Sequence, residues 1–316
     1  MNIADIITEF GAYYLNSGQN TARLLQLLHR PSTTDTVLTP FFTDDTIYRA
    51  SQSKMGRVLQ PFQKAWTPIN DLTFVAIAIE QFKMKIDTQE YPDDLEGTWL
   101  GFLAGDGIKR EEWPFIKWFV EIHLLPQAKE DYEMFEVYHG VYAAPTNGVA
   151  GPAGTSMNGL RKAINDQVTA GRIDPIVLGA VPTDPLALVD YIEAFSDQIN
   201  KAYWKIPMQL CVNETIERNY YRGCDEKYGK DTNHKELGGK VKYANLTVIG
   251  LPSMDGSDKI WATPKNNVLK LGKKTQNMKA MNIQAVDRLV KLFTDWWSGV
   301  GILVPEIVFT NDVDLL

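Results

Sequence analysis

The sequence predicts an α+β protein. The prediction depends on an alternating apolar run from Thr73 to Asp87, a long helical pattern from Arg110 to His139, and short helices and strands that alternate after residue 155. Of the 316 residues, 44% are hydrophobic and 22% are charged, which supplies enough apolar material for a core. This length fits one large domain or two small ones.

Charge and composition exclude several classes of protein. The formal net charge of −7 gives no overall basic field, so a nucleic-acid-binding role for the whole surface is not expected, although the protein could still surround DNA. No apolar run reaches the roughly 18 residues that a membrane span needs. The N-terminus carries Asp5 and Glu9 and no basic region, unlike a secretory signal. Cys211 and Cys224 are the only cysteines, too few for a disulfide framework, and indicate folding in a reducing cytoplasm.

The first thirty residues are expected to form a broken, extended arm. Ile6, Phe10 and Tyr14 recur at helical spacing, but the polar stretch 16–20 interrupts the pattern. Such an arm can bury little by itself and needs a partner surface.

A long two-stranded β excursion follows the arm. It leaves at Ile47 and returns at Phe82, with residues 54–66 near its tip. Val75, Ile77 and Ile79 lie on one face, whereas the apolar residues from Phe82 onward have the opposite parity. We therefore expect either a bulge near residues 80–81 or a strand that moves there from one sheet to another. Ribbons of this kind are marginal in isolation and normally lie against something else.

Two helices are predicted next. Pro92, followed by two aspartates, begins the first helix, which glycines at 105 and 107 end. The longer pattern from Arg110 to His139 has Pro114 in its first turn, where proline is tolerated. Pro126 is interior, and we expect it to kink the helix.

Residues 143–155 are rich in glycine and proline and are the best candidate boundary between subdomains. The stretch from Ile283 to Trp297 fits either a helix or a strand, because its spacing is helical and its composition is β-branched and aromatic. The elements predicted between these two stretches are a helix from Leu160 that Gly171 stops, a strand over Ile176–Val181, a helix that Asp184 and Pro185 begin and that runs through Ile199, a strand over Pro207–Val212, a helix capped by Asn213 and ended by Gly229, a strand over Ala244–Gly250, a turn over Met254–Ser257 and a strand over Lys259–Thr263.

No motif predicts catalysis, a cofactor or a metal ion. The loop from Gly154 to Gly159 has the glycine spacing of a phosphate-binding loop, but Leu160-Arg161 stands where Lys and Ser/Thr are required. The two thiols lack the second Cys/His pair that a zinc site needs. The four histidines are too dispersed for a metal site: they are His29, His123, His139 and His234. Helix capping explains most of the paired carboxylates, which are Asp44-Asp45, Asp93-Asp94 and Glu111-Glu112.

Three stretches carry a resemblance to a known family. They are FKMKIDTQEYPDDLEGTWLGFL at 82–103, GLPSMDGSDKIWATPKNNVL at 250–269 and RLVKLFTDWWSGVGILVPEIVFTND at 288–312. Together with the order of elements, they resemble the major capsid protein of tailed bacteriophages, whose fold encapsulin shells share. The resemblance favours a strand over a helix for residues 288–297. It also implies four parts: an N-terminal arm at 1–35, an extended loop at 36–90, a peripheral domain with a long spine helix at 90–145 and 263–296, and an axial domain at 146–262 and 297–316.

The same resemblance implies a structural protein and not an enzyme. It implies pentamers and hexamers that enclose double-stranded DNA without sequence-specific contact, a virion capsid assembled in the host cytoplasm, a separate scaffolding protein, a portal and decoration proteins. Exposed tryptophans would suit contacts between subunits: this is favoured for Trp66, whereas Trp113 and Trp118 fit a subunit contact or the core equally well. The alternatives are an encapsulin-like compartment that carries cargo and a cytoplasmic α+β enzyme whose site is built from dispersed residues.

Overall fold

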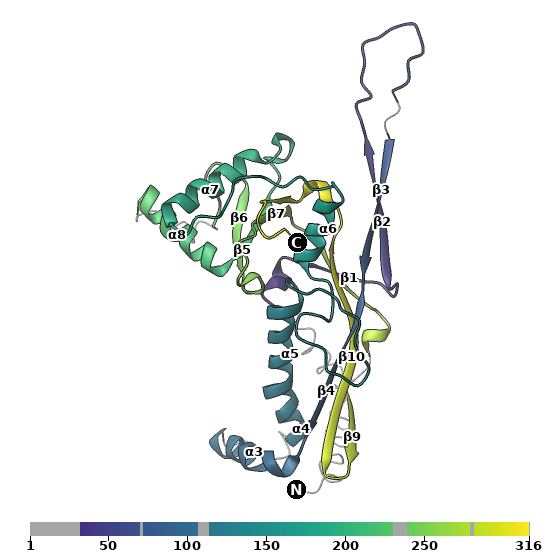
Figure 1. Ribbon diagram of the computed structural model, residues 1–316, viewed down its shortest axis with the longest axis vertical. Helices are drawn as coiled ribbons and strands as arrows, with labels where there is room; N and C mark the ends of the chain where they lie inside the picture. Colours follow the sequence, from purple (N-terminus) through teal and green to yellow (C-terminus); the bar gives the residue numbers. More distant parts are fainter. Residues whose placement is uncertain (1–31, 70–71, 107–113, 230–238, 279–280, 316) are drawn as a thin grey trace.

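The computed structural model describes residues 32–69, 72–106, 114–229, 239–278 and 281–315. The expected arm at residues 1–31, with Ile6, Phe10 and Tyr14, lies outside the described residues. Figure 1 shows an elongated molecule in which a β ribbon projects at one end, a long helix and a sheet run toward the other, and a mixed unit lies to one side. Both helices and strands contribute extensively, as the α+β prediction requires.

The strands form three sheets. One has the order β1-β8-β10-β4 with β9 also paired to β10, the second has the order β11-β7-β5-β6, and the third is the β2–β3 ribbon. The bounds are Thr39–Phe42 for β1, Ile47–Met55 for β2, Leu72–Glu80 for β3, Phe82–Glu90 for β4, Met208–Asn213 for β5, Leu246–Leu251 for β6, Trp261–Pro264 for β7, Val268–Gly272 for β8, Asn282–Val286 for β9, Leu289–Ile302 for β10 and Phe309–Thr310 for β11.

The helices lie between these strands in the chain. They are α3 at Pro92–Asp106, α4 at Phe115–Trp118, a π-helical turn at Phe119–Leu124, α5 at Leu125–Asp131, a second π-helical turn at Tyr132–Glu136, α6 at Leu160–Thr169, α7 at Pro185–Gln198 and α8 at Glu214–Tyr228. Short 3-10 turns lie at Thr34–Thr36, Lys201–Tyr203, Pro252–Met254, Gln276–Met278 and Pro305–Ile307.

The parity break near Gln81 is a change of sheet. Strand β3 pairs with β2 as far as Glu80, and β4 pairs with β10 from Phe82 onward. The Gln81 side chain is buried, and its Nε2 donates to the carbonyl oxygens of Thr43 at 3.0 Å and Asp45 at 2.9 Å. This confirms the second of the two alternatives, a strand that moves from one sheet to another.

Two glycines of β10 allow the base of the ribbon to lie against the main sheet. A Cβ at Gly299 would lie 2.2 Å from the carbonyl oxygen of Glu80, and one at Gly301 would lie 2.6 Å from the side chain of Ile79. Since any side chain there would collide with the ribbon, glycine is required at both positions. Ile77 and Ile79 are buried at this contact.

The spine helix is a continuous run from Phe115 to Glu136 that contains two π-helical turns. Pro126 follows the first of these turns, in which the amide of Leu125 donates to the carbonyl of Val120, five residues back. Because proline cannot donate a backbone hydrogen bond, this wider register accommodates it inside the helix. The expected start of the helix at Arg110 lies outside the described residues.

The central unit follows the predicted capping residues closely. Asp184 accepts from the amide of Ala187 at the start of α7, and Asn213 accepts from the amide of Ile216 at the start of α8. Gly171 and Gly229 have φ angles of +66° and +94° just beyond the ends of α6 and α8, a conformation that favours glycine. The predicted strand over Ile176–Val181 is wrong, because only one isolated bridge, Ile176 to Asn311, forms there.

The segment that could have been helix or strand is strand. Asn282–Val286 and Leu289–Ile302 form a hairpin, and β10 continues across β4 and β8. This long strand connects the lower end of the molecule to the base of the ribbon, as the yellow-green arrow in Figure 1 shows.

Candidate assembly surface

The tip of the β ribbon exposes an unusual number of apolar side chains. Phe62 is 95% exposed, Trp66 91% and Leu59 85%. The other large apolar residues exposed in this region are Met55, Val58, Ile69, Leu72 and Phe74. Contiguous apolar patches of this kind usually mark sites of contact with another molecule. We call residues 54–69 and 72–74 the ribbon tip.

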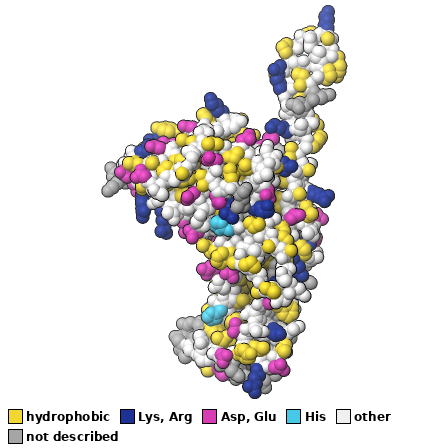
Figure 2. Space-filling model, in the orientation of Figure 1, with side chains coloured by type: hydrophobic (Ala, Val, Ile, Leu, Met, Phe, Trp, Pro, Cys, Tyr) yellow, Lys and Arg dark blue, Asp and Glu magenta, His cyan; other side chains and the backbone are white. Residues whose placement is uncertain are grey.

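The charges of the ribbon tip all have one sign. Lys54, Arg57 and Lys64 lie in it, and no aspartate or glutamate occurs between Asp45 and Asp71. The space-filling view shows basic and hydrophobic side chains together at this end of the molecule (Figure 2). A partner surface should therefore be apolar and acidic.

Beyond its buried base, the ribbon also contacts the body through an exposed ion pair at the far end of β2. Lys54 Nζ lies 3.0 Å from Glu306 Oε1, and the side chains of this pair are 61% and 31% exposed. Exposed ion pairs contribute about 0–1 kcal/mol, so this contact biases the ribbon's direction weakly. The tip beyond Met55 projects away from the rest of the chain, as Figure 1 shows. It cannot bury its apolar residues against its own body in this conformation.

A groove with the complementary character lies beside the end of the spine helix. Its volume is about 690 Å³, and its lining residues are Gln127, Glu130, Asp131, Met134, Phe135, His139, Val141, Ala153, Gly154, Thr155 and Asp255. Phe135 is 46% exposed and Val141 39%. Three carboxylates line the groove, and no lysine or arginine does. We call it the acidic groove. It combines exposed apolar side chains with carboxylates, and no pattern in the sequence predicts it.

The tryptophans suggested as subunit contacts differ in position. Trp66 is exposed at the ribbon tip, and its contact with a neighbouring subunit stays a prediction, whereas Trp118 is 2% exposed and packs against the ring of His123. Core packing is therefore the better interpretation for Trp118. Trp113 lies outside the described residues.

The glycine loop near Gly154 is occupied by a carboxylate of the same chain. The backbone amides of Gly154 and Ser156 donate to the two carboxylate oxygens of Glu136, each at 3.0 Å. Glu136 is buried. These amides are thus already hydrogen bonded to a glutamate of the same chain, and this contact explains the conformation of the loop without a bound phosphate.

The remaining candidate residues have local structural partners. Thr275 donates to Asp44 through its amide and its hydroxyl group, and these bonds lower the pKa of that carboxyl group. Burial raises the pKa of both Cys211 and Cys224, so neither thiol is an activated nucleophile. The ring of His139 lies 2.9 Å from the carbonyl oxygen of Asp255. His29, His234 and the pair Glu111-Glu112 lie outside the described residues.

No group of three or more His, Cys, Asp or Glu side chains suited to a metal ion occurs within the described ranges. Within the same ranges, no helix combines the length and the apolar character that crossing a bilayer requires.

A buried polar cluster fixes the C-terminal segment on the central unit. Asp314 accepts from Ser257 Oγ at 2.7 Å and from Arg161 at 3.2 Å. Lys259 is fully buried, and its Nζ donates to the carbonyl oxygen of Val313 at 3.0 Å. Burial lowers the pKa of Lys259 to about 8, against the opposing effect of Asp314. This cluster was not predicted from the sequence, because it joins three segments, near Arg161, near Ser257 and near Asp314, that lie more than 50 residues apart along the chain.

Chains from solved procapsid and capsid structures share this fold. A chain of the satellite phage P4 procapsid that includes the size determination (Sid) protein is 10% identical, with 98% of this chain and 97% of that chain covered and a TM-score of 0.57. A chain from the capsid of an empty GTA particle is 10% identical, with 89% and 90% covered and a TM-score of 0.51. A chain from the capsid of Myoviridae phage XM1 is 12% identical, with 85% and 88% covered and a TM-score of 0.50.

At these identities the similarity concerns the fold. No family model matches the sequence, and no curated protein matches it either. The alignment nevertheless spans nearly the whole length of both chains in the P4 comparison. The chain has the major capsid fold of tailed bacteriophages.

Proposed function

We propose that this chain is a shell-building subunit that assembles as pentamers and hexamers into an icosahedral capsid around double-stranded phage DNA. In this proposal residues 1–35 are the arm and 36–90 the extended loop. Residues 90–145 and 263–296 form the peripheral domain, and 146–262 with 297–316 form the axial domain. The subunit has a structural role and catalyses no reaction.

The observation that carries the proposal is the ribbon tip. It exposes Leu59, Phe62 and Trp66 almost completely, on a two-stranded ribbon that has no further strand to support it among the described residues. An isolated ribbon of this length is marginally stable in water, and its apolar tip is a liability unless another chain covers it. Assembly with other copies of the chain removes both problems.

The acidic groove supports a contact between copies. The ribbon tip and the groove lie on different parts of one subunit and are unlike each other, so a contact between them is heterologous. Heterologous contacts close into rings when the rotation between subunits divides a full turn. Five or six copies related in this way would each give one tip and accept one.

The remaining partners follow from the same proposal. Assembly takes place in the host cytoplasm with a separate scaffolding protein, the finished shell contains a portal, and decoration proteins bind its outside. The net charge of −7 fits a container that does not hold its DNA through its whole surface.

Imaging of the purified protein, alone and with its scaffolding protein, tests the proposal. We expect closed particles by electron microscopy and a matching mass by light scattering. A protein that stays monomeric under all these conditions would contradict it.

A cysteine pair tests the contact within such particles. Trp66→Cys at the tip and Phe135→Cys in the groove should be joined between subunits by a short bis-maleimide, giving a ladder of covalent oligomers on denaturing gels. The native thiols Cys211 and Cys224 are buried, so the chain without the new pair is the control. Particles that form but give no ladder would reject this contact and leave the shell proposal standing.

A further inference from the structure

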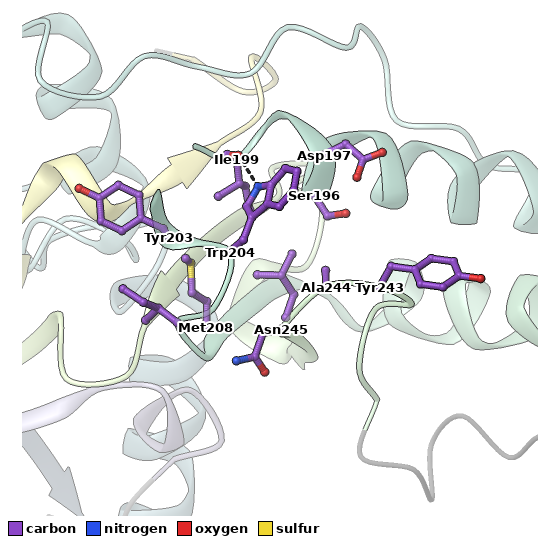
Figure 3. A pocket seen from close by; sticks show the side chains of 11 residues that line it. Ser196, Asp197, Ile199, Tyr203, Trp204, Met208, Tyr243, Ala244 and Asn245 are labelled. Carbon is purple, nitrogen blue, oxygen red and sulfur yellow. Dashed lines mark hydrogen bonds between the residues drawn. The ribbon is translucent and has the colours of Figure 1, made fainter. Parts of the chain in front are cut away.

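A patch of lysines and aromatic rings lies at the far end of the central unit. It is formed by the segment after α7 and the segment before β6, which are joined where the amide of Met208 donates to the carbonyl of Asn245 at 3.0 Å. Its members are Lys201, Trp204, Lys205, Lys240, Lys242 and Tyr243, which we call the lysine–aromatic patch. A shallow pocket, shown in Figure 3, lies between the two segments.

The charge of this patch is opposite to that of the protein. Residues 199–208 and 239–246 contain four lysines and no aspartate or glutamate, in a chain with a net charge of −7. None of the four forms an ion pair with another described residue, and Asp197 is the one carboxylate among the residues that line the pocket. Exposed lysines that have no ion-pair partner attract a polyanion.

One aromatic ring of the patch is almost fully exposed, and the other is half exposed and lines the pocket. Tyr243 is 94% exposed and Trp204 47%. In Figure 3 the Tyr243 ring points away from the pocket, and the Trp204 indole nitrogen is hydrogen bonded to Ile199. Tyr243 also has a φ of +65°, which bulky residues rarely adopt. Backbone strain of this kind persists where the surrounding structure enforces it, often at functional positions.

We propose that the lysine–aromatic patch binds the phosphodiester backbone of a nucleic acid. Lysines bind phosphates as point charges, tyrosine hydroxyl groups also donate to phosphate oxygens, and exposed rings can stack on unpaired bases. An acidic peptide would satisfy the lysines but would offer no flat bases to the rings. The patch therefore fits a nucleic acid better than it fits an acidic protein segment.

Fluorescence anisotropy with labelled 20-mers tests the proposal. The full chain is titrated into duplex DNA, single-stranded DNA and, as the alternative polyanion, a labelled polyglutamate. Lys201→Ala, Lys205→Ala and Lys242→Ala together should weaken DNA binding by about 10-fold or more and reduce the slope of log affinity against log salt by about 0.9 for each duplex phosphate that the variant no longer neutralises. Tighter binding to single-stranded than to duplex DNA would indicate that the rings stack on bases. Equal affinities for the two DNAs would indicate that the chain binds the phosphodiester backbone alone. Both results support the proposal.

A matched triple variant controls for net charge. Lys83→Ala, Lys85→Ala and Lys162→Ala remove the same number of charges from residues that are already ion-paired, and they should leave affinity nearly unchanged. Equal weakening by both triple variants would overturn the proposal, as would a wild-type chain that binds no DNA or binds polyglutamate as tightly as DNA. None of these results depends on whether shells form.

Tyr243→Gly separates binding from folding. Glycine accepts the positive φ without strain, so the variant should be at least as stable as the wild type. If the tyrosine contacts the nucleic acid, affinity should still fall by about fivefold or more, as is typical when a stacked ring is removed. Unchanged affinity in this stable variant would remove Tyr243 from the site.

Discussion

The concentration at which shells form should depend strongly on two side chains of the ribbon tip. Phe62 and Trp66 are 95% and 91% exposed in the isolated chain, so docking can bury almost all of each. Complete burial of a large apolar side chain contributes about 1.5–3 kcal/mol. Replacing either residue by serine should therefore cost about 2 kcal/mol for each contact, which is roughly a 30-fold loss in its association constant.

In the proposed contact each subunit gives one tip and accepts one, so this loss applies once per subunit. We therefore expect the threshold concentration for assembly, measured by light scattering, to rise roughly 30-fold for Phe62→Ser or Trp66→Ser. Both residues lie outside the cores, so circular dichroism and urea unfolding of the unassembled subunit should not change. Val149→Ser and Val177→Ser are the controls, since these residues are 66% and 71% exposed outside the tip. An unchanged threshold for the tip variants, or an equal rise for the controls, would refute the reasoning.

Three further predictions concern stability, each measured by urea unfolding of the subunit. Gly223→Ala should lower the free energy of unfolding by about 3 kcal/mol or more, because the new Cβ would lie 2.1 Å from the carbonyl oxygen of Pro185. Gly101→Ala is the control: nothing lies near its Cβ, and alanine should raise the free energy of unfolding by about 0.5–1 kcal/mol through its higher helix propensity in α3. Gln81→Leu should lower the free energy of unfolding by about 1–3 kcal/mol, since the carbonyl groups of Thr43 and Asp45 lose the hydrogen-bond donor that Gln81 supplies. As the pH rises from 8 to 10.5, the free energy of unfolding of the wild type should rise by up to about 3 kcal/mol relative to that of Lys259→Met. The pKa of Lys259 is lowered to about 8 in the folded chain, so in that range only the unfolded chain binds the proton, and the gain is absent below pH 8. A pH-independent difference between these two chains would contradict the cause assigned to Lys259.

The elements that the sequence predicted well are those that local physics determines. Asp184 and Asn213 cap helices because their side chains satisfy the free amides of the first turn, whatever lies around them. A break in the strand near Gln81 was predictable because parity along a strand assigns each side chain to one face. Parity alone could not distinguish a bulge from a change of sheet, since that depends on which strands are available as neighbours.

The errors occur where distant parts of the chain decide the outcome. Residues 176–181 have the composition of a strand, but the segment beside them offers only a single bridge at Asn311. The amide of Leu178 instead lies 3.5 Å from a side-chain oxygen of Asp312, and Val177 is 71% exposed. Strand propensity describes how well a residue fits a pleated surface, and among the described residues no neighbouring strand runs beside this segment.

The acidic groove shows the same limit for function. Its walls come from the spine helix, from residues 153–155 and from Asp255, so no spacing in the sequence reveals it. Glu130 and Asp131 resemble the solvent-facing carboxylates of any amphipathic helix until the structure places Phe135 and Val141 beside them.

The ribbon tip, in contrast, is visible in the sequence once its charge is considered together with its apolar residues. A segment that contains Phe62 and Trp66 could belong to a core, but Lys54, Arg57 and Lys64 are interspersed among its apolar residues. No carboxylate lies between Asp45 and Asp71, and Glu306 of the same subunit pairs with Lys54 alone among these three in the described ranges. Burial of these cations inside the same subunit would leave unpaired charges in an apolar environment, which is strongly unfavourable. A surface on another molecule that offers both apolar contacts and carboxylates avoids that cost. The pattern therefore indicates an intermolecular contact, and only the identity of the receiving surface requires the structure.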